Sequence, residues 1–177
     1  MKNIFLPLIL LCLCIASCEK DESLNPLATV VGGQFASLNI TKSLLDFNKI
    51  NTTSFGGILT TPSNNIVKYD LYVRYTSSAG FTNDNYVLLK TITSFPVDLD
   101  ITPIDLATAL NKNLVDFKQG DKFRFLAYTY DSNGIVCDYN KLAAPVRTQA
   151  SMKQGYKFVT QLETGANLTN FFDNYGL

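Results

Sequence analysis

The sequence predicts an all-β protein with one short helix in a strand connection. Segments with strand character recur at short intervals, turn-forming residues separate them, and one helix signal stands among them. The chain lacks the regular alternation of strands and helices that parallel sheets require. Six to eight strands of this spacing therefore predict an antiparallel β-sandwich of the immunoglobulin or fibronectin type III kind, over residues 28–163.

The clearest strand runs from Ile66 to Tyr75, because apolar and polar residues alternate along it. This alternation predicts a half-buried strand. A loop rich in turn formers leads to a second strand, Tyr86–Ile92, and we expect the two to pair. The expected inward face of the first strand holds Val67, Tyr69, Leu71, Val73 and Tyr75, and the outward face holds Lys68, Asp70, Tyr72 and Arg74.

A hairpin is predicted later in the chain, where Asp131-Ser132-Asn133-Gly134 separates a strand over Lys122–Tyr130 from one over Ile135–Tyr139. Gly134 can adopt the positive φ that such turns need. Gly32-Gly33 and Gly56-Gly57 indicate bulges or strand ends. Further strands are expected at Thr29–Val31, Phe35–Ile40, Gly57–Thr60 and Tyr156–Leu162.

The helix is expected from Pro103 to about Asn111. Thr102 can cap it, proline is favoured at the first helical position, and Asp105 stands three residues after the cap. Leu106, Ala107 and Leu110 give it an apolar face.

The N-terminus predicts export and a lipid anchor. Met1-Lys2-Asn3 precedes an apolar run over 4–15, which is typical of a cleaved signal peptide. Ile15-Ala16-Ser17-Cys18 resembles the lipobox of bacterial lipoproteins. The resemblance implies that residues 1–17 are removed and that lipid is attached to Cys18. Three acyl chains would anchor the protein permanently, since each buried methylene contributes about 0.8 kcal/mol.

Residues 18–27 are polar and contain Pro26, so we expect an acidic, flexible tether. The acidic cluster Glu19-Lys20-Asp21-Glu22 is similar to the surface-export signal of Bacteroidetes lipoproteins. This similarity implies an outer-membrane lipoprotein exposed at the cell surface. A tether that faces the periplasm is the alternative.

Composition excludes several function classes. Only Lys2 of the 15 basic residues lies in the signal peptide, so 15 acidic and 14 basic residues remain after its removal. The basic residues do not cluster into a stripe, which argues against nucleic-acid binding. Histidine is absent, which removes His-dependent nucleophiles and metal sites. Among the cysteines only Cys137 remains for the folded domain, and we interpret it as a packing residue rather than a reactive thiol.

One carboxylate pair has the spacing of a possible site. Asp98 and Asp100 would share one face of a strand, as a calcium site or an acid/base pair requires. We favour a solvent-facing strand with Val97, Leu99 and Ile101 inward, because no third carboxylate is identifiable nearby. We therefore expect no enzyme activity, no cofactor and no metal.

Two sets of aromatic residues are candidate binding residues. Tyr72, Tyr128 and Tyr130 could stack on sugar rings from an exposed sheet, although tyrosine is common on any sheet. Near the C-terminus, residues 164–177 form a tail with one helical stripe. The stripe would either close the end of its own sandwich or dock to a partner, and it consists of Leu168, Phe171, Phe172 and Tyr175.

The domain itself resembles the small immunoglobulin-like sandwich domains of Bacteroidetes surface lipoproteins. The resemblance is carried by Lys68–Val73, Ser94–Val97, Ile101-Thr102 with the helix, Gly120–Phe125 and Asp131–Gly134. It implies a fold and a location, and some such proteins lie beside nutrient-uptake systems. The functional hypothesis is a non-enzymatic, lipid-anchored binding or accessory module for glycan or nutrient capture. The alternative is a structural or adhesive surface subunit that docks to an outer-membrane protein partner.

Overall fold

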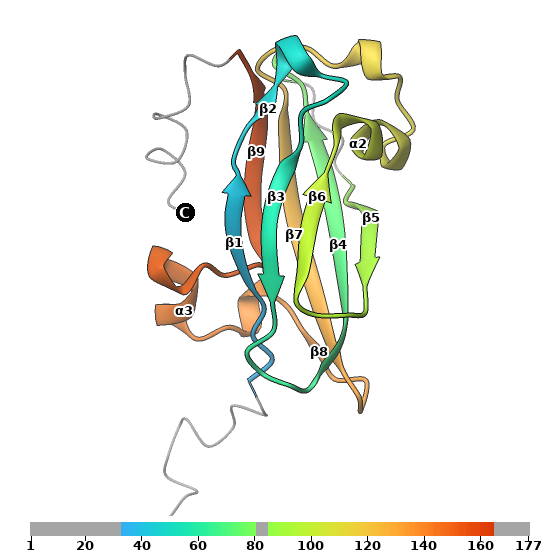
Figure 1. Ribbon diagram of the computed structural model, residues 1–177. Coiled ribbons are helices and arrows are strands. Elements are labelled where there is room, and N and C mark those ends of the chain that lie inside the picture. Colours follow the sequence, from blue (N-terminus) through green and yellow to red (C-terminus); the bar gives the residue numbers. More distant parts are fainter. Residues whose placement is uncertain (1–32, 81–84, 165–177) are drawn as a thin grey trace, which may run out of the picture. The chain divides into compact units, whose positions relative to one another are not determined.

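The computed structural model describes residues 33–80 and 85–164, and this part of the chain is mostly β with antiparallel sheets (Figure 1). One sheet has the strand order β1-β3-β6 and the other the order β2-β9-β7-β4-β5, with β8 paired to β7. Only the β2–β9 pair is parallel among these strands. The strands are β1 (Ser37–Lys42), β2 (Leu45–Asp46), β3 (Phe55–Thr60), β4 (Ile66–Thr76), β5 (Val87–Ile92), β6 (Val97–Ile101), β7 (Lys122–Asp131), β8 (Val136–Cys137) and β9 (Lys157–Glu163).

Short helices connect the strands. The α-helices are α2 (Pro103–Ala109) and α3 (Ala144–Thr148). The 3-10 helices are η2 (Phe47–Lys49), η3 (Leu114–Asp116), η4 (Tyr139–Lys141) and η5 (Ala150–Met152).

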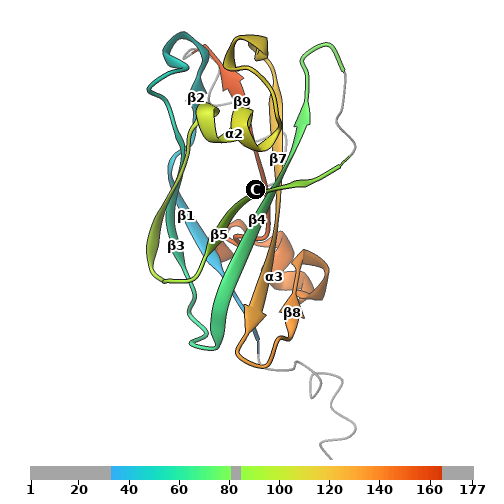
Figure 2. The same ribbon diagram turned by 90° about the vertical axis from the view of Figure 1, so that its right-hand side faces the viewer.

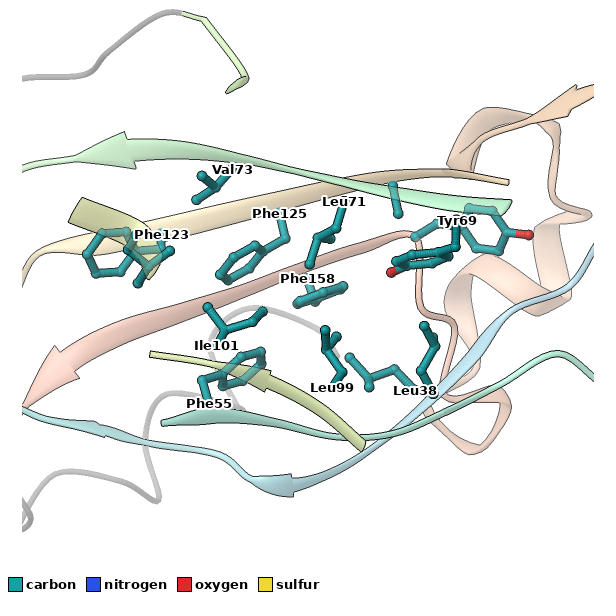
Figure 3. Close-up of a cluster of buried hydrophobic side chains, with 14 of the residues drawn as sticks. Leu38, Phe55, Tyr69, Leu71, Val73, Leu99, Ile101, Phe123, Phe125 and Phe158 are labelled. Atoms are coloured by element: carbon teal, nitrogen blue, oxygen red, sulfur yellow. The ribbon is translucent and has the colours of Figure 1, made fainter. Parts of the chain in front are cut away.

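The core lies between the two sheets, where side chains of β1, β3 and β6 meet those of β4, β7 and β9 (Figure 3). Its centre is a stack of three rings, with centroids of Phe125 and Phe158 4.9 Å apart and Phe55 5.8 Å from each. Each such ring contributes about 1.5–3 kcal/mol by leaving water. Inward-facing aromatic residues on three strands therefore hold the two sheets together.

Strand β4 confirms the predicted inward face except at one position, and on the predicted outward face Asp70 is buried. Tyr69, Leu71, Val73 and Tyr75 are buried, but Val67 is 47% exposed, so its predicted inward placement was wrong. A bulge is the cause, because Ile66 lies opposite Asp131 and Lys68 opposite Tyr130, which leaves Val67 as the extra residue. The predicted pairing of β4 with β5 is confirmed.

The predicted hairpin joins β7 to β8 and turns at Gly134, whose φ is +77°. The Gly134 amide donates to the Asp131 carbonyl oxygen at 3.1 Å, and the Asp131 side chain accepts from the amides of Asn133 and Ile135. Asn133 keeps a negative φ, so the turn has a single left-handed position. The second strand is shorter than predicted, since Asp138 caps η4 directly after it.

Helix α2 has the predicted N-terminus. The Thr102 hydroxyl accepts from the Asp105 amide at 3.1 Å, and the Asp105 carboxylate accepts from the Thr102 amide at 2.9 Å, which is a capping box. The helix ends two residues before the predicted Asn111. Figure 2 shows α2 in the connection between β6 and β7, and Lys90 of β5 reaches Asp105 at 3.1 Å.

The early strands differ in their bounds from the prediction. Strand β1 begins two residues after Phe35, and β3 begins at Phe55. The predicted irregularity at Gly56-Gly57 is confirmed, because the β1–β3 register shifts between Ile40 and Lys42, opposite these glycines. The expected strand at 29–31 lies outside the described residues.

Candidate functional site: a tyrosine face on the larger sheet

The structure brings the three candidate tyrosines together on the outward face of β4 and β7. Lys68 lies opposite Tyr130 and Asp70 opposite Tyr128, so Tyr72 is a diagonal neighbour of Tyr128. The rings of Tyr72 and Tyr128 meet edge to face, with centroids 5.6 Å apart and an interplanar angle of 87°. We call Lys68, Asp70, Tyr72, Tyr128 and Tyr130 the tyrosine face.

An ion-paired network fixes one side of the tyrosine face. Lys68 Nζ lies 2.8 Å from an Asp70 carboxylate oxygen and 3.7 Å from the centre of the Tyr130 ring. The Thr91 hydroxyl of β5 donates to the same carboxylate at 2.7 Å. The side chains of this network are thus positioned before any ligand arrives.

The network also sets the charge state of its members. Burial disfavours the Asp70 carboxylate, but hydrogen bonds from Lys68 and Thr91 outweigh it and lower the pKa of that carboxyl. Burial, together with the nearby Asp70 charge, raises the pKa of the Tyr130 phenol. Around neutral pH the face therefore presents a carboxylate, an ammonium and a neutral phenol.

The open part of the face lies at Tyr72 and Tyr128, since Lys68 covers one side of Tyr130. Leu88 of β5 lies opposite Tyr72 and is 50% exposed, which adds an apolar side chain beside the ring. The face thus combines aromatic and aliphatic surface with fixed polar groups. Binding sites for small ligands commonly have this composition, in which the polar groups fix the orientation of the ligand.

The acidic pair Asp98 and Asp100 has another role. Lys42 of β1 reaches both carboxylates, at 3.2 Å and 2.8 Å, and its hydrogen bond lowers the pKa of Asp100. Leu99, which lies between the two aspartates, and Ile101, which follows them, are buried, as expected for a solvent-facing pair on a strand. Residues 33–80 and 85–164 contain no group of three or more acidic or cysteine side chains that could hold a metal ion.

Cys137 is partly buried against the core, with its Sγ 3.7 Å from the Asp138 carbonyl oxygen. Burial raises the pKa of its thiol. A raised pKa lowers the thiolate fraction and hence the reactivity, which supports a packing role.

The structure also has a cavity that was not predicted from the sequence. A cavity of about 230 Å³ lies between β1 and residues 147–154, with Leu38, Ile40 and Phe158 among its apolar lining. Arg147 and Lys153 also line it, and Lys153 Nζ donates to the Asn39 side chain at 2.7 Å. The cavity joins segments that are far apart in the chain, so no local pattern indicates it.

Other sequence predictions fall outside the described residues. These are the lipidation site Cys18, the tether 18–27 and the C-terminal stripe of Leu168, Phe171, Phe172 and Tyr175. Within the described residues, no helix is both long and apolar enough to cross a bilayer. The chain matches no known family model, no curated protein and no solved structure.

Proposed function

We propose that this protein is a non-enzymatic, lipid-anchored binding module of the cell envelope and that its tyrosine face captures glycans. The observation that carries this proposal is the clustering of Tyr72 and Tyr128 beside the fixed Lys68–Asp70 pair. Sugar rings present apolar C–H surface to aromatic rings and hydroxyl groups to nearby polar side chains. A face that is positioned in advance loses little side-chain entropy on binding.

We further propose that the fold is of the immunoglobulin or fibronectin type III kind. The strand order supports this assignment. In such folds strands A, B and E share one sheet, while C, F and G share the other. With β1, β3, β4, β6, β7 and β9 as A, B, C, E, F and G, the partition is the same, and β5 takes the place of C′.

The positions of the carboxylates support the non-enzymatic part of the proposal. A hydrolase that lacks histidine would need a paired acid and base in a cleft. Asp98 and Asp100 instead share Lys42, and Asp70 is paired with Lys68. Each of these carboxylates is thus paired with a lysine, which suits structural and binding roles.

The lipobox-like Ile15-Ala16-Ser17-Cys18 supports attachment to the membrane through Cys18. The acidic tether supports a position on the outer surface of the outer membrane, with the periplasmic side as the alternative. A flexible tether would let the domain reach extended glycans while it stays anchored.

A glycan array screened with the lipid-free mature chain (residues 18–177 with Cys18→Ser) tests the proposal. Tyr72→Ala and Tyr128→Ala should each weaken glycan binding about tenfold. We take the lower end of the roughly 1–3 kcal/mol that a nucleobase gains by stacking on an aromatic side chain as the scale for a sugar ring. The melting temperature should change little. Tyr139→Ala, in a partly buried tyrosine of η4 outside the face, is the matched control.

A blank array contradicts glycan capture. Affinity purification from detergent-solubilised membranes then examines the alternative function. Membrane proteins that co-purify with the full chain, and are lost on deletion of residues 164–177, would favour a structural or adhesive subunit that docks through the C-terminal stripe.

A further inference from the structure

Two arginines lie side by side next to the tyrosine face. Arg74 of β4 lies directly opposite Arg124 of β7, on the same outward face as Tyr72. Like charges in directly opposite positions of an antiparallel pair are destabilising. Such an arrangement needs compensation by a nearby anion.

The described part of the chain supplies no such anion. Neither arginine forms an ion pair within residues 33–80 and 85–164. Arg124 donates from Nη1 to the Thr76 hydroxyl at 2.7 Å, and the Arg74 guanidinium lies 5.2 Å from the centre of the Tyr86 ring. Among the described residues, both groups are held in place by neutral partners.

One donor of the pair is also unsatisfied. Within the part of the chain that the structure describes, Arg74 Nε is buried and has no hydrogen-bond partner. A buried donor without a partner costs about 1–3 kcal/mol, so this guanidinium has an unmet hydrogen-bond demand.

The outward positions of β4 and β7 near the two arginines have a net positive charge. Lys68, Arg74 and Arg124 lie there with the carboxylate of Asp70. Lys68 already neutralises Asp70. The face therefore attracts anions.

We propose that the tyrosine face binds an acidic saccharide, whose ring stacks at Tyr72 and Tyr128 and whose carboxylate or sulfate group is held by Arg74 and Arg124. Alternate residues of a strand lie about 7 Å apart, so Tyr72 and Arg74 are within reach of one ligand. Guanidinium groups bind such anions with two parallel hydrogen bonds. This inference rests on the proposed function and names its ligand class.

Calorimetric titration of the lipid-free mature chain tests the inference. The probes are trigalacturonate, its fully methyl-esterified form with the same rings and no charge, and galactose 6-sulfate, which carries a sulfate and no carboxylate and so separates the two sources of the anion. We expect the charged probe to bind at least tenfold more tightly than the ester. Affinity for the charged probe should fall in 0.5 M salt, because exposed charges are then screened.

Arg74→Gln and Arg124→Gln should each reduce the affinity for the charged probe about tenfold to a hundredfold and leave the affinity for the ester unchanged. The range follows from the strength of hydrogen bonds to charged groups. Arg147→Gln, which changes an arginine of the cavity beside β1, is the matched control. The melting temperatures of all three variants identify any that fail to fold. If Arg74→Gln does not fold, Arg124→Gln alone tests the role of the arginine pair.

The outcomes separate this inference from the proposed function. Equal affinity for trigalacturonate and its ester, with binding that depends on Tyr72, overturns the acidic ligand and keeps glycan capture. Loss of binding in Arg147→Gln alone also overturns the inference, since the anion then occupies the cavity. Charge-dependent binding that is lost in both arginine variants but not in Tyr72→Ala supports the arginine pair and contradicts ring stacking. No binding of any probe overturns the inference.

Discussion

Replacement of Gly57 by alanine tests how closely β1 and β3 approach. A Cβ atom at Gly57 would lie 2.0 Å from the Asn39 carbonyl oxygen and 2.8 Å from the Thr41 amide nitrogen, whereas ordinary contact begins at about 3.4 Å. Both atoms belong to the backbone of β1, so no side-chain rotation relieves the overlap. The two strands must separate by more than about 1 Å.

The separation has two costs. It weakens the neighbouring ladder hydrogen bonds, at about 1 kcal/mol each. It also disturbs Leu38 and Leu59, which are paired across the two strands and buried, and strain of this kind typically costs 1–3 kcal/mol. We expect a total loss of about 3 kcal/mol. For a domain of this size that corresponds to a melting temperature lower by roughly 10 °C.

Gly134→Ala is the matched control for this effect. A Cβ at Gly134 meets nothing within 4 Å, but the φ of +77° is unfavourable for alanine. The expected loss is only about 1 kcal/mol, or roughly 3–5 °C. Thermal unfolding of the lipid-free mature chain, followed by circular dichroism, measures both. A Gly57→Ala variant no less stable than Gly134→Ala would refute the close approach of β1 and β3.

Two further predictions concern the charge network and the anchor. The pKa of Asp70 is lowered in the folded protein, so its stabilising contribution is complete above the unfolded pKa and is lost as the pH falls through the folded value. The stability deficit of Asp70→Asn, measured by urea unfolding, should therefore be larger at pH 7 than at pH 3, which lies below the ordinary pKa of 3.8; an equal deficit at both would contradict the ion pair. In cells, Cys18→Ser should abolish incorporation of a labelled fatty acid, and labelling at the wild-type level would disprove the lipobox.

Local patterns account for the parts of the fold that the sequence predicts. The alternation in β4 and the capping signal at Thr102 each depend on a few neighbouring residues, and both are confirmed. The exposure of Val67 was missed because a bulge depends on the register with β7, which alternation does not specify. Helix α3 was missed because its five residues are too few for a periodic pattern.

The candidate site was predictable to a similar degree. Tyr72, Tyr128 and Tyr130 were named as aromatic residues of exposed strands, and the pairing of β4 with β7 places them together. The opposition of Arg74 and Arg124 follows only from the register of these two strands, which are separated in the sequence by β5, β6 and α2. Contacts between distant segments carry no local signal, and the same reason explains why the cavity beside β1 was missed.

The central claim is that the tyrosine face is the ligand-binding surface of this domain. Nuclear magnetic resonance of the ¹⁵N-labelled, lipid-free mature chain during titration with trigalacturonate tests it most directly. The account predicts saturable shifts of the backbone amides of β4 and β7 around Tyr72, Arg74, Arg124 and Tyr128, and unshifted amides in β1 and residues 147–154. Shifts confined to β1 and residues 147–154, or no shifts at millimolar ligand, would contradict it.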